Sequence, residues 1–205
     1  NNISETSNIG TIVGKLENGQ ILDVKVYSNL LLKLADNKAQ GQKLYIGGIA
    51  GYLDNSIVNA IDKTESEKDE ASVSRVYSDI DLILSQKYEY SYDILLGGAF
   101  GFVKNSKVFN CYTTGDMKVD SKNNETNMVA LYTSGLLAHM QDEANKDASV
   151  VANNISAGNI YPDYEQPTSN DKTSIKYGLY QDFVYGGIVG KIESEVASQT
   201  IANNY

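Results

Sequence analysis

Carboxylates are the only catalytic side chains that this sequence supplies in quantity. Asp79 and Asp81 alternate along one extended segment, and Asp116 lies on the corresponding segment further along the chain. Paired carboxylates on one face can act as general acid and base on a glycosidic bond. A basic residue such as Arg75 or Lys118 would have to assist, but no spacing selects either one. We therefore interpret these acidic residues mainly as a solvated surface.

The single histidine and the single cysteine add little chemistry. His139 cannot form a zinc site of several histidines, and we expect it to be exposed and without function. Cys111 has no partner for a disulfide within the chain. Its place beside Tyr112 predicts a small buried apolar side chain instead of a reactive thiol. The sequence therefore predicts no catalytic residue, no metal ligand and no cofactor.

Tyrosines are abundant, at 15 of 205 residues, and two groups of them suit recognition. Tyr88, Tyr90 and Tyr92 alternate along one segment and so share a face. Tyr161 and Tyr164 lie in the longest apparent insertion. A tyrosine offers a flat apolar ring with a hydroxyl, which suits contact with a host protein or a glycan. These five are our candidate binding residues; the alternative is that they pack loops against the body of the protein.

Composition limits the remaining classes. With 26 acidic and 17 basic residues the net charge is −9, which opposes binding to the phosphates of nucleic acid. No apolar stretch approaches the roughly 20 residues that a bilayer-spanning helix needs, so we expect no membrane insertion. The 41% hydrophobic content and 17 glycines are typical of an ordered, strand-rich domain.

An internal repeat is the strongest structural signal. Five segments share an apolar core with glycines: IGTIVG (9–14), YIGGIAG (45–51), LGGAFG (96–101), YTSGLLA (132–138) and YGGIVG (185–190). A second element follows each one. We align one position from each of these elements with Ile3 near the start of the sequence, which gives Ile3, Tyr27, Tyr77, Tyr112, Ile155 and Tyr205. The shortest spacing, from Ile3 to Tyr27, is 24 residues, which suits one coil of a β-solenoid.

Alternation with period two predicts strands in these units. Apolar and polar residues alternate within 24–34 and 76–84, so one set faces inward and the other outward. We expect the polar runs to be loops or small hairpins: 36–43, 61–71, 85–93, 120–127, 141–148 and 161–173. The predicted fold is an all-β parallel solenoid of about five coils, forming one domain over residues 1–205.

Glycines and asparagines are expected at the corners of the coils. Glycine lets the backbones of neighbouring coils approach, and the glycines in question are Gly48, Gly98 and Gly187. Asn110, Asn153 and Asn203 each lie two residues before the aligned position. Stacked amides there can hydrogen-bond along the coil axis. The alternative is that asparagine is simply common in turns.

The repeat resembles the GLUG motif, in which GGhhG (h, apolar) is followed by hxNxY and a glycine-containing turn. Its best copy here is GGAFG (97–101) with VFNCYTTG (108–115), while 47–51 and 186–190 match the first half. Similar repeats occur in large bacterial surface and secreted proteins, including adhesins and the non-catalytic N-terminal regions of IgA-cleaving zinc metalloproteases. The resemblance implies a right-handed parallel β-helix outside a bacterial cell. The zinc-binding HExxH of those proteases has no counterpart in this sequence.

We therefore expect a non-catalytic extracellular repeat module that acts as a stalk, an adhesive surface or a partner-binding surface. One alternative is the substrate-recognition region of a metalloprotease similar to the IgA-cleaving enzymes. A glycan-active β-helix enzyme is the less favoured alternative. Because the chain begins inside one unit and stops inside another, we expect it to be an excerpt of a longer protein.

Overall fold

The described part of the protein consists of strands joined by turns and bends. The computed structural model describes residues 6–34, 42–59, 74–84, 92–120, 129–162, 180–195 and 200–205, and these ranges contain no helix. The predicted all-β class is therefore confirmed. Of the predicted loops, 141–148 lies wholly in the described part, and it separates two strands that end at Asp142 and begin at Val150.

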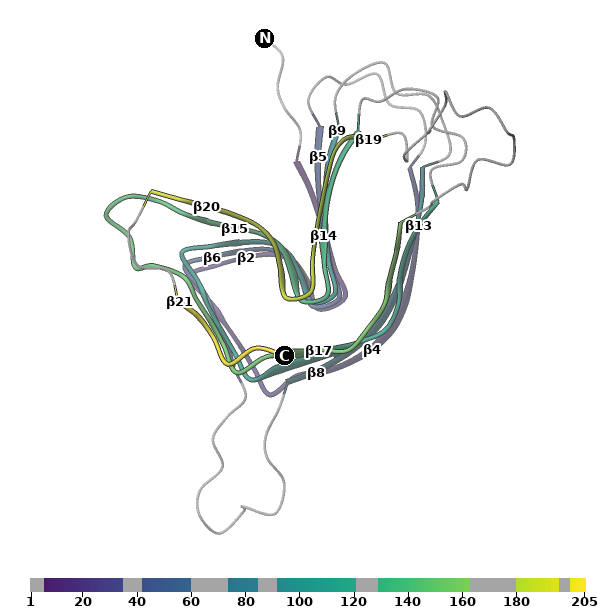
Figure 1. Cartoon of the computed structure of the whole chain (residues 1–205). Helices are drawn as coiled ribbons and strands as arrows, with labels where there is room; N and C mark the ends of the chain where they lie inside the picture. Colours follow the sequence, from purple (N-terminus) through teal and green to yellow (C-terminus); the bar gives the residue numbers. More distant parts are fainter. Residues whose placement is uncertain are drawn as a thin grey trace, which may run out of the picture.

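The chain returns repeatedly to the same sheets, and one circuit is called a pass (Figure 1). The first pass contains β1 (Thr6–Gly10), β2 (Val13–Glu17), β3 (Gln20–Leu22) and β4 (Lys25–Leu34). The second contains β5 (Gln42–Gly47), β6 (Ala50–Asp54), β7 (Ile57–Asn59) and β8 (Ser74–Leu84). The third contains β9 (Tyr92–Gly97), β10 (Phe100–Lys104), β11 (Lys107–Phe109), β12 (Cys111–Thr114) and β13 (Met117–Asp120). The fourth contains β14 (Val129–Ser134), β15 (Leu137–Asp142), β16 (Val150–Ala152), β17 (Ile155–Ser156) and β18 (Ile160–Pro162). The last contains β19 (Tyr180–Gly186), β20 (Val189–Ser194) and β21 (Thr200–Ala202).

Strands from successive passes pair to form four sheets. Sheet A has the order β1-β5-β9-β14-β19, and sheet B has the order β2-β6-β10-β15-β20. Sheet C is β21-β16-β11-β7-β3, and sheet D is β17-β12-β8-β13-β18 with β4 also paired to β8. The pairs are parallel, as β5 with β9 and β10 with β15 illustrate. This stacking is consistent with a β-solenoid.

Sheets A and B meet at a sharp corner that points into the cross-section (Figure 1). Just beyond the corner, a Cβ on Gly51 would lie 2.5 Å from the backbone nitrogen of Ile9. A Cβ on Gly101 would lie equally close to the nitrogen of Ile46. In the second and third passes the final glycine of the repeat is therefore required, because the two backbones approach too closely for a side chain, whereas the fourth pass has Ala138 at this position.

The corner divides the interior into two apolar cores. The larger core includes Phe100, Leu53, Val103 and Met140, from the inner side of sheet B, and also reaches sheet C. The second core lies between sheets A and D and includes Ile46, Leu96, Ile80, Met117 and Leu131. Inward residues of one pass thus stack on those of the next, as period-two alternation predicts.

Register in sheet D differs from the sequence alignment. Tyr27 does pair with Tyr77, but Tyr77 pairs with Thr114, whereas Tyr112 pairs with Arg75. The alignment of Tyr77 with Tyr112 is therefore wrong by two residues. The reason is that inward residues fix the register, as in the pairing of the buried Ile80 with the buried Met117.

The asparagines serve both as turn residues and as a ladder. Asn110, Asn153 and Asn203 all adopt left-handed backbone conformations, with φ of 53°, 59° and 52°. The Nδ2 of Asn203 donates to Oδ1 of Asn153 over 3.3 Å. One residue later, the fully buried Asn154 donates from Nδ2 to Oδ1 of Asn204 over 3.0 Å and accepts from the backbone N–H of Cys111 over 2.9 Å. Both alternatives for the asparagines therefore hold.

A second polar ladder joins the corners between sheets B and C. Asn18, Asn55 and Asn105 adopt the left-handed conformation there, and Asn55 donates to Asn18. Three serines follow in successive passes: Ser56, Ser106 and Ser149. The N–H of each of the first two donates to the hydroxyl of the next serine, over 3.0 and 2.9 Å. Sequence analysis missed this ladder because its members lie outside the repeat motif.

We expect Gly98→Ala to lower the free energy of unfolding by about 3 kcal/mol, since overpacking a rigid site is costly. The added Cβ would collide with the carbonyl oxygen of Gly135 in the next pass. Urea unfolding followed by circular dichroism measures the change. The matched control is Gly187→Ala, at the same turn position of the last pass, where a Cβ meets no atom within 4 Å. Equal destabilisation by the two variants would contradict this account.

Asn154→Ala is expected to cost about 2 kcal/mol of stability, because it leaves buried backbone groups without partners. The N–H of Cys111 loses its acceptor, and the carbonyl of Val108 loses a donor at 3.2 Å. Thermal unfolding measures the loss. Asn203→Gly is the control, because it removes an exposed amide while glycine retains access to the left-handed conformation. A smaller loss for Asn154→Ala than for this control would disprove the importance of the buried ladder.

Candidate functional site: an aromatic groove

A column of outward-facing side chains runs along sheet B directly after the corner. Backbone pairing places five residues in register, one per pass: Lys15, Tyr52, Phe102, His139 and Lys191. The repeat in the sequence predicts this register, because each of the five residues directly follows the last position of its core motif. Because the corner is sharp, this column faces sheet A across a groove instead of facing open solvent.

Sheet A supplies the opposite wall. Its corresponding column consists of Asn8, Tyr45, Leu95, Tyr132 and Val184. The ring of Tyr45 stacks on Phe102, with centroids 5.0 Å apart and planes within 13°, and lies 6.0 Å from Tyr52. Tyr52 and Phe102 stack on each other at 5.3 Å. Tyr45 and Phe102 are only 8% and 6% exposed, so the rings fill this part of the groove.

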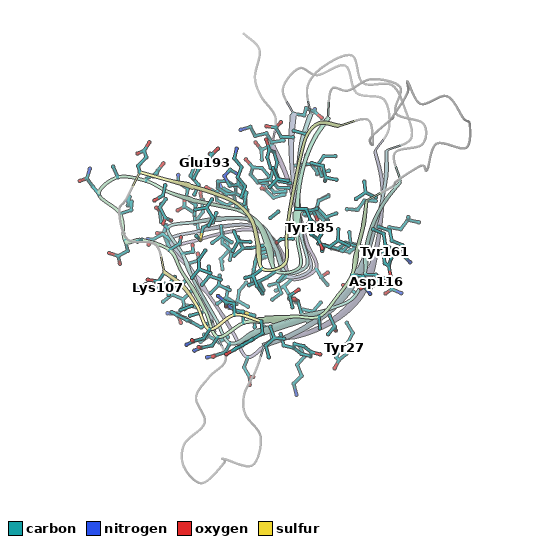
Figure 2. All side chains as sticks on the ribbon, viewed as in Figure 1. Tyr27, Lys107, Asp116, Tyr161, Tyr185 and Glu193 are labelled. Atoms are coloured by element: carbon teal, nitrogen blue, oxygen red, sulfur yellow. The ribbon has the colours of Figure 1, made fainter. Side chains whose placement is uncertain are left out.

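A pocket of about 220 Å³ opens next to these rings. It lies where Leu95 occupies the position that tyrosine holds in the passes before and after it. The apolar wall consists of Leu95, Tyr45, Phe102 and Tyr132. The polar lining consists of Lys43, Asp93, His139, Gln141, Lys191 and Glu193. Figure 2 shows Glu193 on β20, on the side of sheet B toward the groove opening.

His139 lies inside the groove, which corrects the expectation of an exposed residue. It is 8% exposed and packs edge-on against Phe102, with centroids 5.0 Å apart. Burial lowers the pKa of the imidazole to about 4, although Glu193 acts in the opposite direction. Its Nε2 is buried without a hydrogen bond, 3.4 Å from Oε2 of Glu193. The expectation failed because sheet A covers a column that alternation alone assigns to the surface.

Lys191 and Glu193 form an ion pair at the groove. Lys191 Nζ lies 2.5 Å from Oε1 of Glu193 and 4.9 Å from the centroid of the Tyr132 ring. The hydrogen bond from Lys191 lowers the pKa of Glu193. Burial, aided by Asp93, raises the pKa of the Tyr45 hydroxyl. At neutral pH the imidazole of His139 is therefore neutral, Glu193 is a carboxylate and the hydroxyl of Tyr45 is protonated.

Of the five candidate binding residues from the sequence, only Tyr161 has a side chain among those that the structure describes. Tyr88, Tyr90 and Tyr164 lie outside the described residues, as does the side chain of Tyr92. Tyr161 is 48% exposed on β18 and pairs with Lys118 on the outer side of sheet D (Figure 2). The groove could have been predicted from the aromatic residues that flank the glycines of the repeat.

Of the other groups that the sequence singles out, the side chains of Cys111 and Asp116 are described, whereas those of Asp79, Asp81 and Arg75 lie outside the described part. Cys111 is buried, as predicted, and burial raises the pKa of its thiol to about 12. Asp116 accepts hydrogen bonds from the backbone and side chain of Asn159, at 3.2 and 3.0 Å. In the described ranges, no three His, Cys, Asp or Glu residues gather as a metal site would require. The same ranges include no helix of the length and apolarity needed to cross a bilayer.

Comparisons with models of known protein families, with curated proteins and with solved structures found no match to this chain. The groove is thus characterised by its own geometry.

His139 is expected to reduce stability in mild acid. Its pKa is about 4 in the folded protein against 6.5 ordinarily, so only the unfolded chain gains a proton between these values. The free energy of unfolding should therefore fall as pH drops from 6.5 to 4, by about 3 kcal/mol from this residue. Denaturant unfolding across this pH range measures the change in the free energy of unfolding. The reference is His139→Phe, whose substituted side chain cannot titrate.

Because His139 is the only histidine, its titration can be followed as a single imidazole signal by NMR. We expect a midpoint near 4. A midpoint near 6.5, or an identical pH dependence of stability in the wild type and in His139→Phe, would show that the imidazole is solvated.

Proposed function

We propose that this chain is a non-catalytic binding module of an extracellular bacterial surface or secreted protein. The observation that carries the proposal is the aromatic groove, in which two columns from neighbouring sheets present ring faces and paired charges beside a pocket. Aromatic side chains with a polar rim are typical of recognition sites. An extracellular location is supported by the resemblance of residues 97–115 to the GLUG repeat.

The proposed fold is a right-handed parallel β-helix of about five coils. Its support is the repeated strand order of sheets A and B. In Figure 1 the last pass runs counterclockwise from β19 to β20 and β21, and later passes lie nearer the viewer, which supports right-handed winding. Such a stack is stiff because each coil is held by its neighbours. It therefore suits a stalk or spacer that also carries a binding surface.

The GLUG resemblance also favours a second, narrower form of this proposal. In that form the chain is the substrate-engaging region of a secreted metalloprotease similar to the IgA-cleaving enzymes, and immunoglobulin A is the partner of the groove. The first form predicts attachment to host surfaces in general, whereas the second predicts a preference for immunoglobulin A.

Adhesion of coated beads tests the proposal. Beads that carry the chain should bind to cultured epithelial cells or to immobilised immunoglobulin A, and Tyr132→Ala should reduce the bound number several-fold by removing a groove ring. Tyr161→Ala is the control, because this exposed tyrosine lies on sheet D, away from the groove. Circular dichroism should show that both variants retain the fold.

Adhesion no greater than that of bare beads on either surface would contradict the proposal. Loss with Tyr161→Ala but not with Tyr132→Ala would instead move the binding surface to sheet D. Selective binding to immunoglobulin A would favour the protease-associated form.

A further inference from the structure

We infer that the pocket beside Leu95 binds a single neutral sugar ring belonging to a larger glycan. The inference rests on the proposed function, because it names the ligand class of the same groove. Three properties of the pocket support it: its size, its balance of charge and its mixture of flat apolar and hydrogen-bonding surface.

The size of the pocket favours a ligand group no larger than one small ring. The pocket volume of about 220 Å³ is below the roughly 300–1,000 Å³ of sites that enclose drug-sized ligands. Strands of adjacent passes lie about 4.8 Å apart, so Tyr45 and Tyr132, two passes apart, are separated by about 9.6 Å along the stack. Leu95 lies between them and leaves a gap that one ring-shaped group can fill, while the rest of a glycan extends through the groove opening.

The balance of charge disfavours an ionic ligand. Lys43 and Lys191 are balanced by Asp93 and Glu193, and His139 is neutral at pH 7. Strong recognition of an anion would need an excess of cations, and recognition of a cation would need an excess of carboxylates. The balanced lining therefore favours a neutral ligand.

Hydrogen-bonding capacity favours hydroxyl groups. The lining offers donors on the lysines, acceptors on the carboxylates, and both kinds of group on Gln141 and His139. A purely apolar ligand would remove water from these groups without forming hydrogen bonds to them, at a cost in affinity. Sugar hydroxyls both donate and accept, and the C–H face of a sugar can lie against the ring of Tyr132 or Phe102.

The buried nitrogen of His139 also favours a ligand with hydroxyl groups. Nε2 makes no hydrogen bond, and Glu193, 3.4 Å away, has a side chain that is 45% exposed. A small rotation of Glu193 would open the nitrogen to the pocket. A hydroxyl can pair with this nitrogen in either imidazole tautomer, because it can donate to a bare nitrogen and accept from a protonated one.

Titration calorimetry and saturation-transfer NMR with methyl glycosides of glucose, galactose, mannose and N-acetylglucosamine test the inference. At least one of these probes should bind to the wild type. Leu95→Tyr should weaken this binding about tenfold or more, which is about 1.4 kcal/mol, because it continues the tyrosine column and fills the gap. Leu95→Ile is the control of equal size and should bind as the wild type does.

A second variant protects the test if Leu95→Tyr unfolds the protein. Gln141→Leu removes a hydrogen-bonding group from the rim of the pocket and should weaken binding about three- to tenfold without loss of thermal stability. Unchanged binding by a folded Leu95→Tyr or by Gln141→Leu would overturn the inference. So would the absence of binding to every neutral glycoside, or binding restricted to N-acetylneuraminic acid, which is anionic.

The two proposals fail in different ways. Beads that adhere through Tyr132, combined with no binding of any glycoside, would disprove the sugar pocket and leave the binding module intact. Glycoside binding in the absence of bead adhesion would disprove the proposed adhesive role and leave the pocket intact.

Discussion

The backbone of sheet B passes that of sheet A so closely at their shared corner that no Cβ fits between them at Gly51 or Gly101. This contact bends the cross-section inward and divides the interior into two apolar cores. It also turns the next outward-facing column toward sheet A, so that Tyr52, Phe102 and His139 pack against other side chains. Core and groove are therefore two consequences of the same glycine position.

Polar ladders solve a separate problem, which is how to turn a chain sharply without leaving buried backbone groups unpaired. The side chain of Asn154 accepts a hydrogen bond from the N–H of Cys111 in the pass before it. Between sheets B and C, the hydroxyls of Ser106 and Ser149 likewise accept from backbone N–H groups of the preceding pass. Where an insertion interrupts the ladder, the buried carboxylate of Asp142 accepts from the N–H groups of Asn105 and Ser149, at 3.1 and 2.9 Å. Apart from the bond between Ser149 and Asp142, which lies within the fourth pass, these hydrogen bonds also tie one pass to the next, so the turns reinforce the register of the strands.

Sequence alone predicted the strands, the parallel stacking of repeats and the place of His139 in its column, because inward apolar residues and corner glycines recur at matching positions. It failed where side chains point outward. Tyr77 and Tyr112 look equivalent in sequence, yet they differ in register by two residues, because inward residues such as Ile80 and Met117 set the pairing of the strands. His139 was assigned to solvent because alternation distinguishes the two faces of a strand but does not reveal that another sheet covers the outer one. The pocket could not be foreseen, since it depends on Leu95 being shorter than tyrosines that lie far away in sequence.

Leu95 also shows how such a protein can change its specificity. Its column takes one side chain from each pass, and Asn8, Tyr45, Tyr132 and Val184 show that the same backbone accepts polar, aromatic and aliphatic residues there. A single codon change can therefore close the cavity at one level of the stack or open another at a different level, while the glycines and the buried amides continue to maintain the framework. Evolution could vary the ligand in this way at little cost in folding, much as loops are varied on other scaffolds.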